Sequence, residues 1–139
     1  GKAYTDFDGD YTIGTYTVNT SNVMGSTYGG ELNVLQFKKS SGTLTVDGTF
    51  QKVTVVMYST YDFSSTDLIY VDDTMQTINK ETVNATKEDT GAKYTNNKGA
   101  SFNIYKYTIE LSLGAATTGT FKVTNKNTFA LYIGSIVLE

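Results

Sequence analysis

The stretch Thr43 to Tyr58 reads TLTVDGTFQKVTVVMY and contains two runs in which apolar and polar residues alternate. Alternation with a period of two is typical of β-strands that bury one face. We therefore expect strands at Thr43 to Val46 and at Phe50 to Tyr58. The residues between them, Val46-Asp47-Gly48-Thr49, include an Asp-Gly pair, which supplies the positive φ angles of a two-residue turn. The stretch predicts an antiparallel β-hairpin.

The same kind of pattern extends over the rest of the chain, where Thr, Val, Ile, Tyr and Phe fill short runs between Gly, Asn, Asp and Ser. Such runs favour strands joined by tight turns, and no segment shows a convincing helical period. Further strands are expected at residues 11–18, 31–38, 68–71, 75–78, 102–113, 119–124 and 129–138. About nine strands at this spacing predict an all-β fold, a β-sandwich of two antiparallel sheets.

Two connections carry their own predictions. Asn125-Lys126-Asn127 separates two expected strands, and because Asn tolerates the left-handed region we expect a second hairpin there. Residues 79–100 form a polar stretch that is long for a structureless loop inside one domain. We expect it to hold an irregular strand near residues 83–86 or 92–95, and otherwise to be functional or mobile.

The composition bounds the function. The chain has 139 residues, a formal net charge of −3 and neither His nor Cys, which fits a single domain, residues 1–139. The missing side chains exclude Ser-His and Cys-His catalysis and the usual ligands of zinc, copper and haem. The acidic balance argues against nucleic-acid binding, and no apolar run is long enough for membrane insertion. The opening Gly1-Lys2-Ala3 suggests a module excised from a longer multidomain protein.

Side-chain parity sorts the tyrosines of the strand expected at residues 102–113. Alternate residues of a strand point to opposite faces, so Tyr105 and Tyr107 share a face with Ile109. We expect that face to lie in the core, which makes both tyrosines structural. The run at residues 129–138 carries apolar side chains on both faces, which indicates a central strand or one covered by a loop.

Two segments resemble a known class of protein. The run GTLTVDGTFQKVTVVMYST and the closing LYIGSIVLE are similar to parts of bacterial carbohydrate-binding modules with a jelly-roll or galactose-binding-like β-sandwich. The resemblance covers residues 31–71 and 102–139. It implies a non-catalytic, extracellular, sugar-binding module of the kind appended to polysaccharide-degrading enzymes. The chain departs from many such modules in having no Trp, which argues against binding to crystalline cellulose.

A sugar site needs an exposed flat aromatic ring beside short polar groups, and residues 58–67 (YSTYDFSSTD) offer both. We expect Tyr61 and Phe63 to form a platform and Asp62 to bind sugar hydroxyls, with Tyr58 beside them. An equally weighted alternative is that Phe63 and Tyr58 fold back to cap the core, because loops often pack their own side chains. Two further candidates, each a lone aromatic among small polar residues, are Tyr28 and Tyr94.

Other sites are open at this stage. Lysines could bind the carboxylates of uronate polymers, although acidic residues are interleaved with most of them, which favours an ordinary solvated loop. These lysines are Lys87, Lys93, Lys98, Lys122 and Lys126. Modules of the kind resembled here often hold one structural Ca²⁺, for which the weak candidate ligands are Asp72, Asp73 and Glu31. Carboxylate pairs that could in principle hydrolyse a glycosidic bond are Asp62 with Asp67, and Asp72 with Asp73.

We therefore expect a non-catalytic carbohydrate-binding module that attaches a secreted or cell-surface bacterial protein to plant cell-wall or dietary polysaccharide. It would act as a monomeric unit within a larger chain and require no cofactor. The main alternative is a structural or adhesive domain of a bacterial surface protein, and a weaker one is a small glycan-active enzyme.

Overall fold

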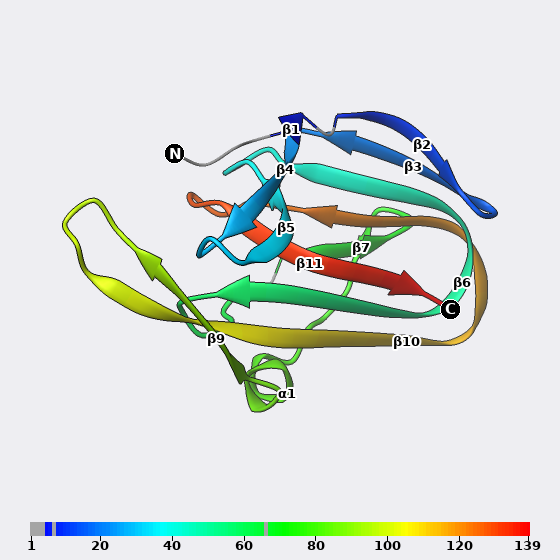
Figure 1. The fold of residues 1–139 in the computed structure, drawn as a ribbon. Coiled ribbons are helices and arrows are strands. Elements are labelled where there is room, and N and C mark those ends of the chain that lie inside the picture. Colours follow the sequence, from blue (N-terminus) through cyan, green and yellow to red (C-terminus); the bar gives the residue numbers. More distant parts are fainter. Residues whose placement is uncertain (1–4, 7, 66) are drawn as a thin grey trace.

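The computed structural model describes residues 5–6, 8–65 and 67–139, so Gly1-Lys2-Ala3 lie outside the described residues. Within these ranges the chain forms strands, connecting loops and one short helix (Figure 1). The strands are β1 (Thr5–Asp6), β2 (Gly9–Ile13), β3 (Tyr16–Ser21), β4 (Val23–Tyr28), β5 (Leu32–Phe37), β6 (Thr43–Ser59), β7 (Ile69–Val71), β8 (Thr74–Met75), β9 (Glu88–Thr95), β10 (Ser101–Thr124) and β11 (Leu131–Leu138), and the helix is α1 (Lys80–Ala85). The all-β prediction is confirmed.

Hydrogen bonds join the strands into one antiparallel sheet, with the path β1-β4-β5-β11-β6-β10-β7-β8 and with β2, β3 and β9 attached beside it. The long strands β6 and β10 lie in the middle and pair with each other along almost their whole length. The first half of β6 also pairs with β3, and its second half pairs with β11. Both long strands curve at the same place (Figure 1), where the register shifts between Ser112 and Thr117 of β10.

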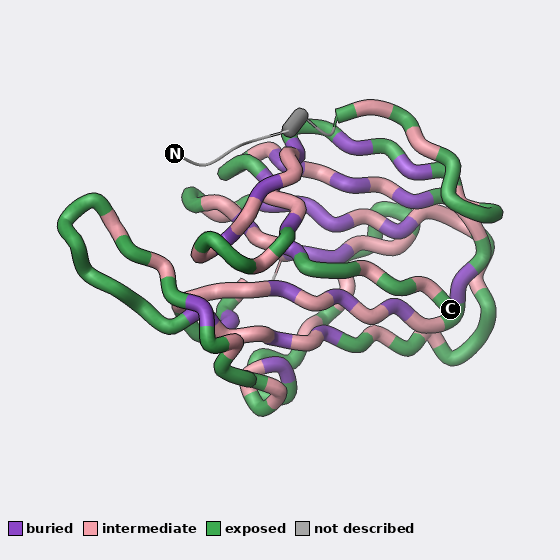
Figure 2. The backbone as a smooth tube through the Cα atoms, in the orientation of Figure 1, coloured by how far each residue is buried: buried purple, intermediate pink, exposed green. Residues whose placement is uncertain are grey.

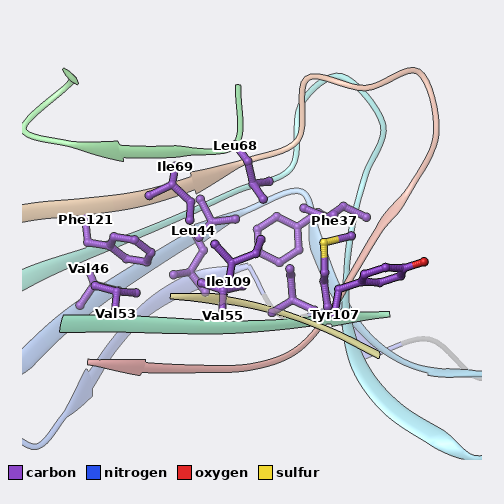
Figure 3. Packing of buried hydrophobic residues seen from close by; sticks show 14 of the residues in the cluster. Phe37, Leu44, Val46, Val53, Val55, Leu68, Ile69, Tyr107, Ile109 and Phe121 are labelled. Atoms are coloured by element: carbon purple, nitrogen blue, oxygen red, sulfur yellow. The ribbon is translucent and has the colours of Figure 1, made fainter. Parts of the chain in front are cut away.

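Residues from both sides of this curve pack into one core (Figure 3). Leu44 and Val46 come from the first half of β6, whereas Val53 and Val55 come from its second half, and all four are buried. β10 contributes Ile109 before the curve and Phe121 after it, with further residues supplied by the neighbouring strands. The curved sheet therefore encloses the apolar side chains that its alternating pattern places on one face.

The hairpin predicted at Asp47-Gly48 is wrong, because β6 runs without interruption through both residues. Asp47 faces Thr17 of β3 on one side and Thr120 of β10 on the other. A Cβ atom at Gly48 would lie 2.8 Å from Cε1 of the Tyr16 ring and closer still to Cδ1. Gly48 therefore serves to admit this ring and not to form a turn, which is a recognised use of glycine inside a strand.

The hairpin predicted at Asn125-Lys126-Asn127 is also wrong, since β10 and β11 lie on opposite sides of β6 and do not pair with each other. The connection is held by Asn125, which is 1% exposed. Its Nδ2 donates to the carbonyl oxygens of Phe37, Lys38 and Phe129 at 3.2, 3.3 and 2.9 Å. A buried amide thus fixes a crossover that a local turn pattern does not distinguish from a hairpin.

Other boundaries differ in instructive ways. The strand expected at residues 11–18 is two strands, because Gly14 has φ 59° and turns the chain between β2 and β3.

The expectation of no helix is wrong: residues 80–85 form α1, which Asn79 caps by accepting a hydrogen bond from the Thr82 N–H at 3.0 Å. Of the two irregular strands considered for the polar stretch, the one near residues 92–95 is confirmed as part of β9, whereas residues 83–86 lie in and just after α1.

The parity predictions are confirmed. Tyr107 and Ile109 are buried, and Tyr105 packs against the same core. β11 lies between β5 and β6, and the register shift between Ile133 and Ser135 lets Ile136 reach the core as well as Ile133.

The hairpin of β9 with the start of β10, residues 88–106, projects from the body of the molecule and is called the arm below (Figure 1). Most of it is exposed (Figure 2). Among the described residues, no helix is long and apolar enough to cross a membrane.

Candidate functional site

One cavity of about 390 Å³ lies where the end of β6 and the loop after it meet the arm and the start of β11. All six residues predicted as ligand-binding from the sequence line it. They are Tyr28, Tyr58, Tyr61, Asp62, Phe63 and Tyr94. The fold thus brings together side chains that are distributed over residues 28–94 of the chain.

Exposed aromatic rings gather at this cavity. Tyr61, Phe129 and Phe102 are 74%, 59% and 44% exposed and all three line it. The other large apolar side chains with comparable exposure in the described part of the chain, such as Ile13 and Met75, are not aromatic. Tyr61 comes from the loop after β6, Phe102 from the arm and Phe129 from the crossover before β11. Three separate segments therefore present rings to solvent around one hollow, an arrangement that is typical of interaction sites.

A fixed stack of tyrosines forms the wall behind these rings. Tyr28 is buried, and its ring is stacked on that of Tyr132 with the centroids 3.9 Å apart and the planes 7° from parallel. The Tyr94 ring lies 6.0 Å from Tyr28 at 40°. Burial, together with the neighbouring Tyr132, raises the pKa of Tyr28 to about 12. Tyr28 is therefore a neutral, rigid support and not the exposed platform that its polar surroundings in the sequence suggest.

Tyr58 packs against the same stack, and its position depends on a glycine in the next strand. A Cβ atom at Gly134 would lie 2.6 Å from Cε2 of the Tyr58 ring. The register shift in β11 occurs at this glycine. Gly134 thus admits the Tyr58 ring and also marks where β11 leaves β5.

The placement of Phe63 corrects the predicted platform. Phe63 is 4% exposed and belongs to the main core, so its ring cannot stack on a ligand as Tyr61 can. Asn84 of α1 holds its backbone from both sides, with Oδ1 accepting from the Phe63 N–H at 2.8 Å and Nδ2 donating to its carbonyl at 3.0 Å. Of the two alternatives considered from the sequence, Phe63 follows the one in which it folds back on the core.

Asp62 lies at the rim of the cavity in a small charged network. Its Oδ1 accepts hydrogen bonds from Lys87 Nζ and from the Tyr107 hydroxyl, both at 3.2 Å. The bond from Lys87, then that from Tyr107, hold the pKa of this carboxyl below its usual range, so Asp62 is ionised at neutral pH. Burial and the neighbouring Asp62 raise the pKa of Tyr107 to about 12, which keeps its hydroxyl a donor. The Tyr107 hydroxyl points out of the core cluster (Figure 3).

The cavity also holds hydroxyl and amide groups. They come from Ser59, Thr60, Ser64, Ser65, Asn96 and Asn127. Asn96 Oδ1 accepts from the N–H groups of Lys98 and Ala100 at 2.9 and 3.0 Å, which orients the amide, and Nδ2 makes no bond within the described part of the chain. Asn127 Nδ2 donates to Ser65 Oγ at 2.9 Å. Short polar groups in fixed positions are what a ligand rich in hydroxyls requires.

Sequence reasoning missed several lining residues, among them Phe102, Phe129, Tyr132 and Asn127. Phe102 and Phe129 stand at the first positions of their expected strands, and parity placed Phe129 on the same face as Leu131 and Ile133. The structure begins β11 at Leu131, so Phe129 belongs to the crossover and is free of that parity. An aromatic residue just before a strand, next to Asn and Thr, was the available signal.

The weak metal candidates have other roles. Asp72 and Asp73 form the tight turn between β7 and β8, both with positive φ. Asp72 Oδ1 accepts from the Thr120 N–H at 2.9 Å, and Asp73 pairs with Lys122 at 3.7 Å. Glu31 lies in the turn between β4 and β5. Within residues 5–6, 8–65 and 67–139, no three acidic side chains gather in a way that could hold a metal ion.

A second cleft, of about 570 Å³, lies between the β2–β3 hairpin and β11. Its described lining is mostly aliphatic, and includes Ile13, Leu35, Val46 and Val137, with no carboxylate, amide or ammonium group. Tyr11, Tyr16, Thr12 and Ser135 also line it, but it contains none of the residues predicted to bind a ligand.

Comparisons of the chain with models of protein families, with curated proteins and with solved structures find no match.

Proposed function

We propose that this chain is a non-catalytic carbohydrate-binding module that attaches a secreted or cell-surface bacterial protein to plant cell-wall or dietary polysaccharide. The observation that carries the proposal is the set of three exposed rings, Tyr61, Phe102 and Phe129, around one polar-rimmed cavity. Exposing three aromatic side chains at one place leaves apolar surface in water, and a partner that covers them recovers that free energy.

The chemistry of the cavity supports a sugar. A sugar ring has apolar C–H faces, which pack on aromatic rings, and hydroxyl edges, which need donors and acceptors close by. The cavity supplies both, through Tyr61 and Phe129 on one hand and Asn96, Asn127 and Asp62 on the other. Its volume of about 390 Å³ falls at the lower end of the range for small-ligand sites, about 300 to 1,000 Å³. An open site of this size covers only a short piece of a chain, so we expect modest affinity.

The distribution of carboxylates supports a binding role over a catalytic one. Glycoside hydrolysis ordinarily uses two carboxyl groups on either side of the bond that is cleaved. Asp62 is the one carboxylate among the described residues that line the cavity, while Asp67 pairs with Lys126 at 3.3 Å. The proposal needs no cofactor.

The finer fold assignment belongs with this proposal. We propose that the curved sheet is a jelly-roll-type β-sandwich in which the two halves of β6 and β10 take part in opposite layers. The shared core of Val46, Val53, Ile109 and Phe121 supports it, because these residues come from both sides of the curve. In this view the binding cavity lies at one end of the sandwich, beside the arm.

Affinity gel electrophoresis tests the function. The protein is run in gels containing xylan, xyloglucan, mannan, starch or pectin, beside the variants Tyr61→Ala and Phe129→Ala. The control variant is Ile13→Ala, which removes an exposed apolar side chain from the second cleft. We expect at least one polysaccharide to retard the wild type and Ile13→Ala, and to retard both aromatic variants less. If no polysaccharide retards the protein, the proposal fails and a structural or adhesive domain becomes the better account. Release of reducing sugar from a retarded polysaccharide would instead favour an enzyme.

A further inference from the structure

The charges at the cavity bear on which polysaccharides it accepts. Among the described residues that line it, Asp62 is the one with a formal charge, and that charge is negative. The remaining polar groups are neutral hydroxyls and amides, such as those of Ser64 and Asn96. A ligand that enters the cavity thus meets one anion and no cation on its walls.

The lysines that could have balanced a bound carboxylate are already paired with acidic side chains or lie outside the lining. Lys87 bonds to Asp62 and also lies over the Tyr105 ring, 4.1 Å from its centroid. Lys126 pairs with Asp67 at 3.3 Å and donates to the Tyr70 hydroxyl at 2.8 Å. Lys122 pairs with Asp73, and the exposed Lys93 and Lys98 of the arm do not line the cavity.

We propose that the cavity selects neutral polysaccharides and rejects those built from uronates, with Asp62 as the residue that sets this choice. The inference rests on the proposed function. A uronate carboxylate in the cavity would give up its hydration without gaining a charge-assisted bond, and it would face Asp62 at short range. A neutral sugar suffers neither penalty, and its hydroxyls can donate to the Asp62 oxygen that Lys87 and Tyr107 leave open.

Removing the charge of Asp62 should raise the affinity of the cavity for uronate polysaccharides relative to neutral ones. Asp62→Asn takes away the repelling anion and at the same time leaves the Lys87 ammonium without its partner at 3.2 Å. Both changes favour a carboxylate ligand. Two unit charges about 5 Å apart in water correspond to roughly a fourfold change in affinity, so we expect uronate binding to rise three- to fivefold or more at low salt. The gain should shrink as salt screens the charges.

Affinity gels with polygalacturonate and alginate, beside xyloglucan, mannan and starch, test the proposal at low and high salt. The matched control is Glu110→Gln, which removes one negative charge from an exposed residue that does not line the cavity. Circular dichroism confirms that each variant is folded. We expect a neutral polymer to retard the wild type, uronate polymers to retard it weakly or not at all, and the ratio of uronate to neutral retardation to rise in Asp62→Asn and not in Glu110→Gln.

Two results would overturn the inference, and they differ in meaning. Retardation of the wild type by polygalacturonate or alginate equal to or stronger than that by every neutral polymer would refute the selectivity while leaving the binding function intact. An unchanged ratio in a folded Asp62→Asn variant would remove Asp62 from the selection. Absence of retardation by all polymers would refute the proposed function itself, and the inference with it.

Discussion

The uninterrupted course of β6 depends on the absence of a side chain at Gly48, and a double-mutant cycle with Tyr16 tests this directly. Gly48 does not have positive φ, so its backbone would accept alanine if there were space. The space is taken by the Tyr16 ring, whose Cε1 would lie 2.8 Å from the new Cβ, and whose hydroxyl donates to the Thr49 carbonyl at 2.9 Å. Gly48→Ala must therefore displace the ring or the strand.

The magnitudes follow from known classes of substitution. Forcing one extra carbon into a filled position costs about 1 to 3 kcal/mol of unfolding free energy. Tyr16→Ala removes a half-buried ring and costs about 2 kcal/mol. In the Tyr16→Ala background the clash is gone, so Gly48→Ala should be neutral or stabilise by about 0.5 kcal/mol, since glycine loses more chain entropy than alanine on folding. The coupling energy between the two positions should thus be about 1 to 3 kcal/mol.

Urea unfolding followed by circular dichroism measures the four proteins. With a urea dependence of about 1 to 3 kcal/mol per molar for a domain of this size, a 2 kcal/mol change moves the midpoint by roughly 1 M. Additive effects, within about 0.5 kcal/mol, would contradict the reasoning, because residues that do not touch behave independently. That outcome would show that the Tyr16 ring does not limit the space at Gly48.

Four further predictions concern other parts of the account. Asn125→Ala should lower the free energy of unfolding by about 2 to 3 kcal/mol, because it removes the buried amide that donates to the carbonyls of Phe37, Lys38 and Phe129. A loss below about 0.5 kcal/mol in urea unfolding would show that the crossover is held otherwise. Tyr107→Phe should raise the pKa of Asp62 towards its ordinary value, because a hydrogen bond that favours the ionised carboxylate is lost. Carboxyl ¹³C NMR titration measures the pKa of Asp62 in this variant and in the control variant Tyr105→Phe. An unchanged pKa in Tyr107→Phe would exclude the hydrogen bond. Folding lowers the pKa of Asp62, so this carboxylate stabilises the fold above its ordinary pKa, and the stabilisation is lost as the pH falls through the lowered pKa. Lys87→Met should therefore make the free energy of unfolding less dependent on pH in the acid range. An unaltered dependence of that free energy on acid pH would contradict this. Asp73→Gly should stabilise the protein by about 0.5 kcal/mol, because Asp73 has φ 64°, which glycine adopts more easily, and its exposed ion pair with Lys122 contributes little. A lower melting temperature of the variant would show that the ion pair contributes more than the turn conformation costs.

The local pattern was sufficient for the fold class and for part of the site. Period-two alternation in residues 43–58 and 102–113 predicted extended strands, and in residues 102–113 it also predicted the inward face, because parity is a property of a few consecutive residues. Tyr61 stood out for the same reason: an aromatic residue among Ser, Thr and Asp has no local reason to be buried, and it is exposed.

What failed depends on contacts between distant residues. Asp47-Gly48 has the composition of a turn, and only the Tyr16 ring and the strands on both sides show why it is straight. Phe63 is as polar in its surroundings as Tyr61, but Asn84, which lies 21 residues later, ties its backbone down. Phe129 reaches the cavity because Asn125 fixes the crossover by donating to the carbonyls of Phe37 and Lys38, which lie 88 and 87 residues earlier. None of these contacts leaves a signal within a window of ten residues.

The central claim is that the cavity around Tyr61, Phe102 and Phe129 holds a neutral glycan. The most direct test is to titrate ¹⁵N-labelled protein with an oligosaccharide of whichever polymer retards it in gels, and to follow the backbone amide resonances. We predict that shifts concentrate in residues 58–65, 94–102 and 127–132, with Ile13 and Val137 of the second cleft unmoved. Shifts confined to the second cleft, or none at millimolar ligand, would contradict the account.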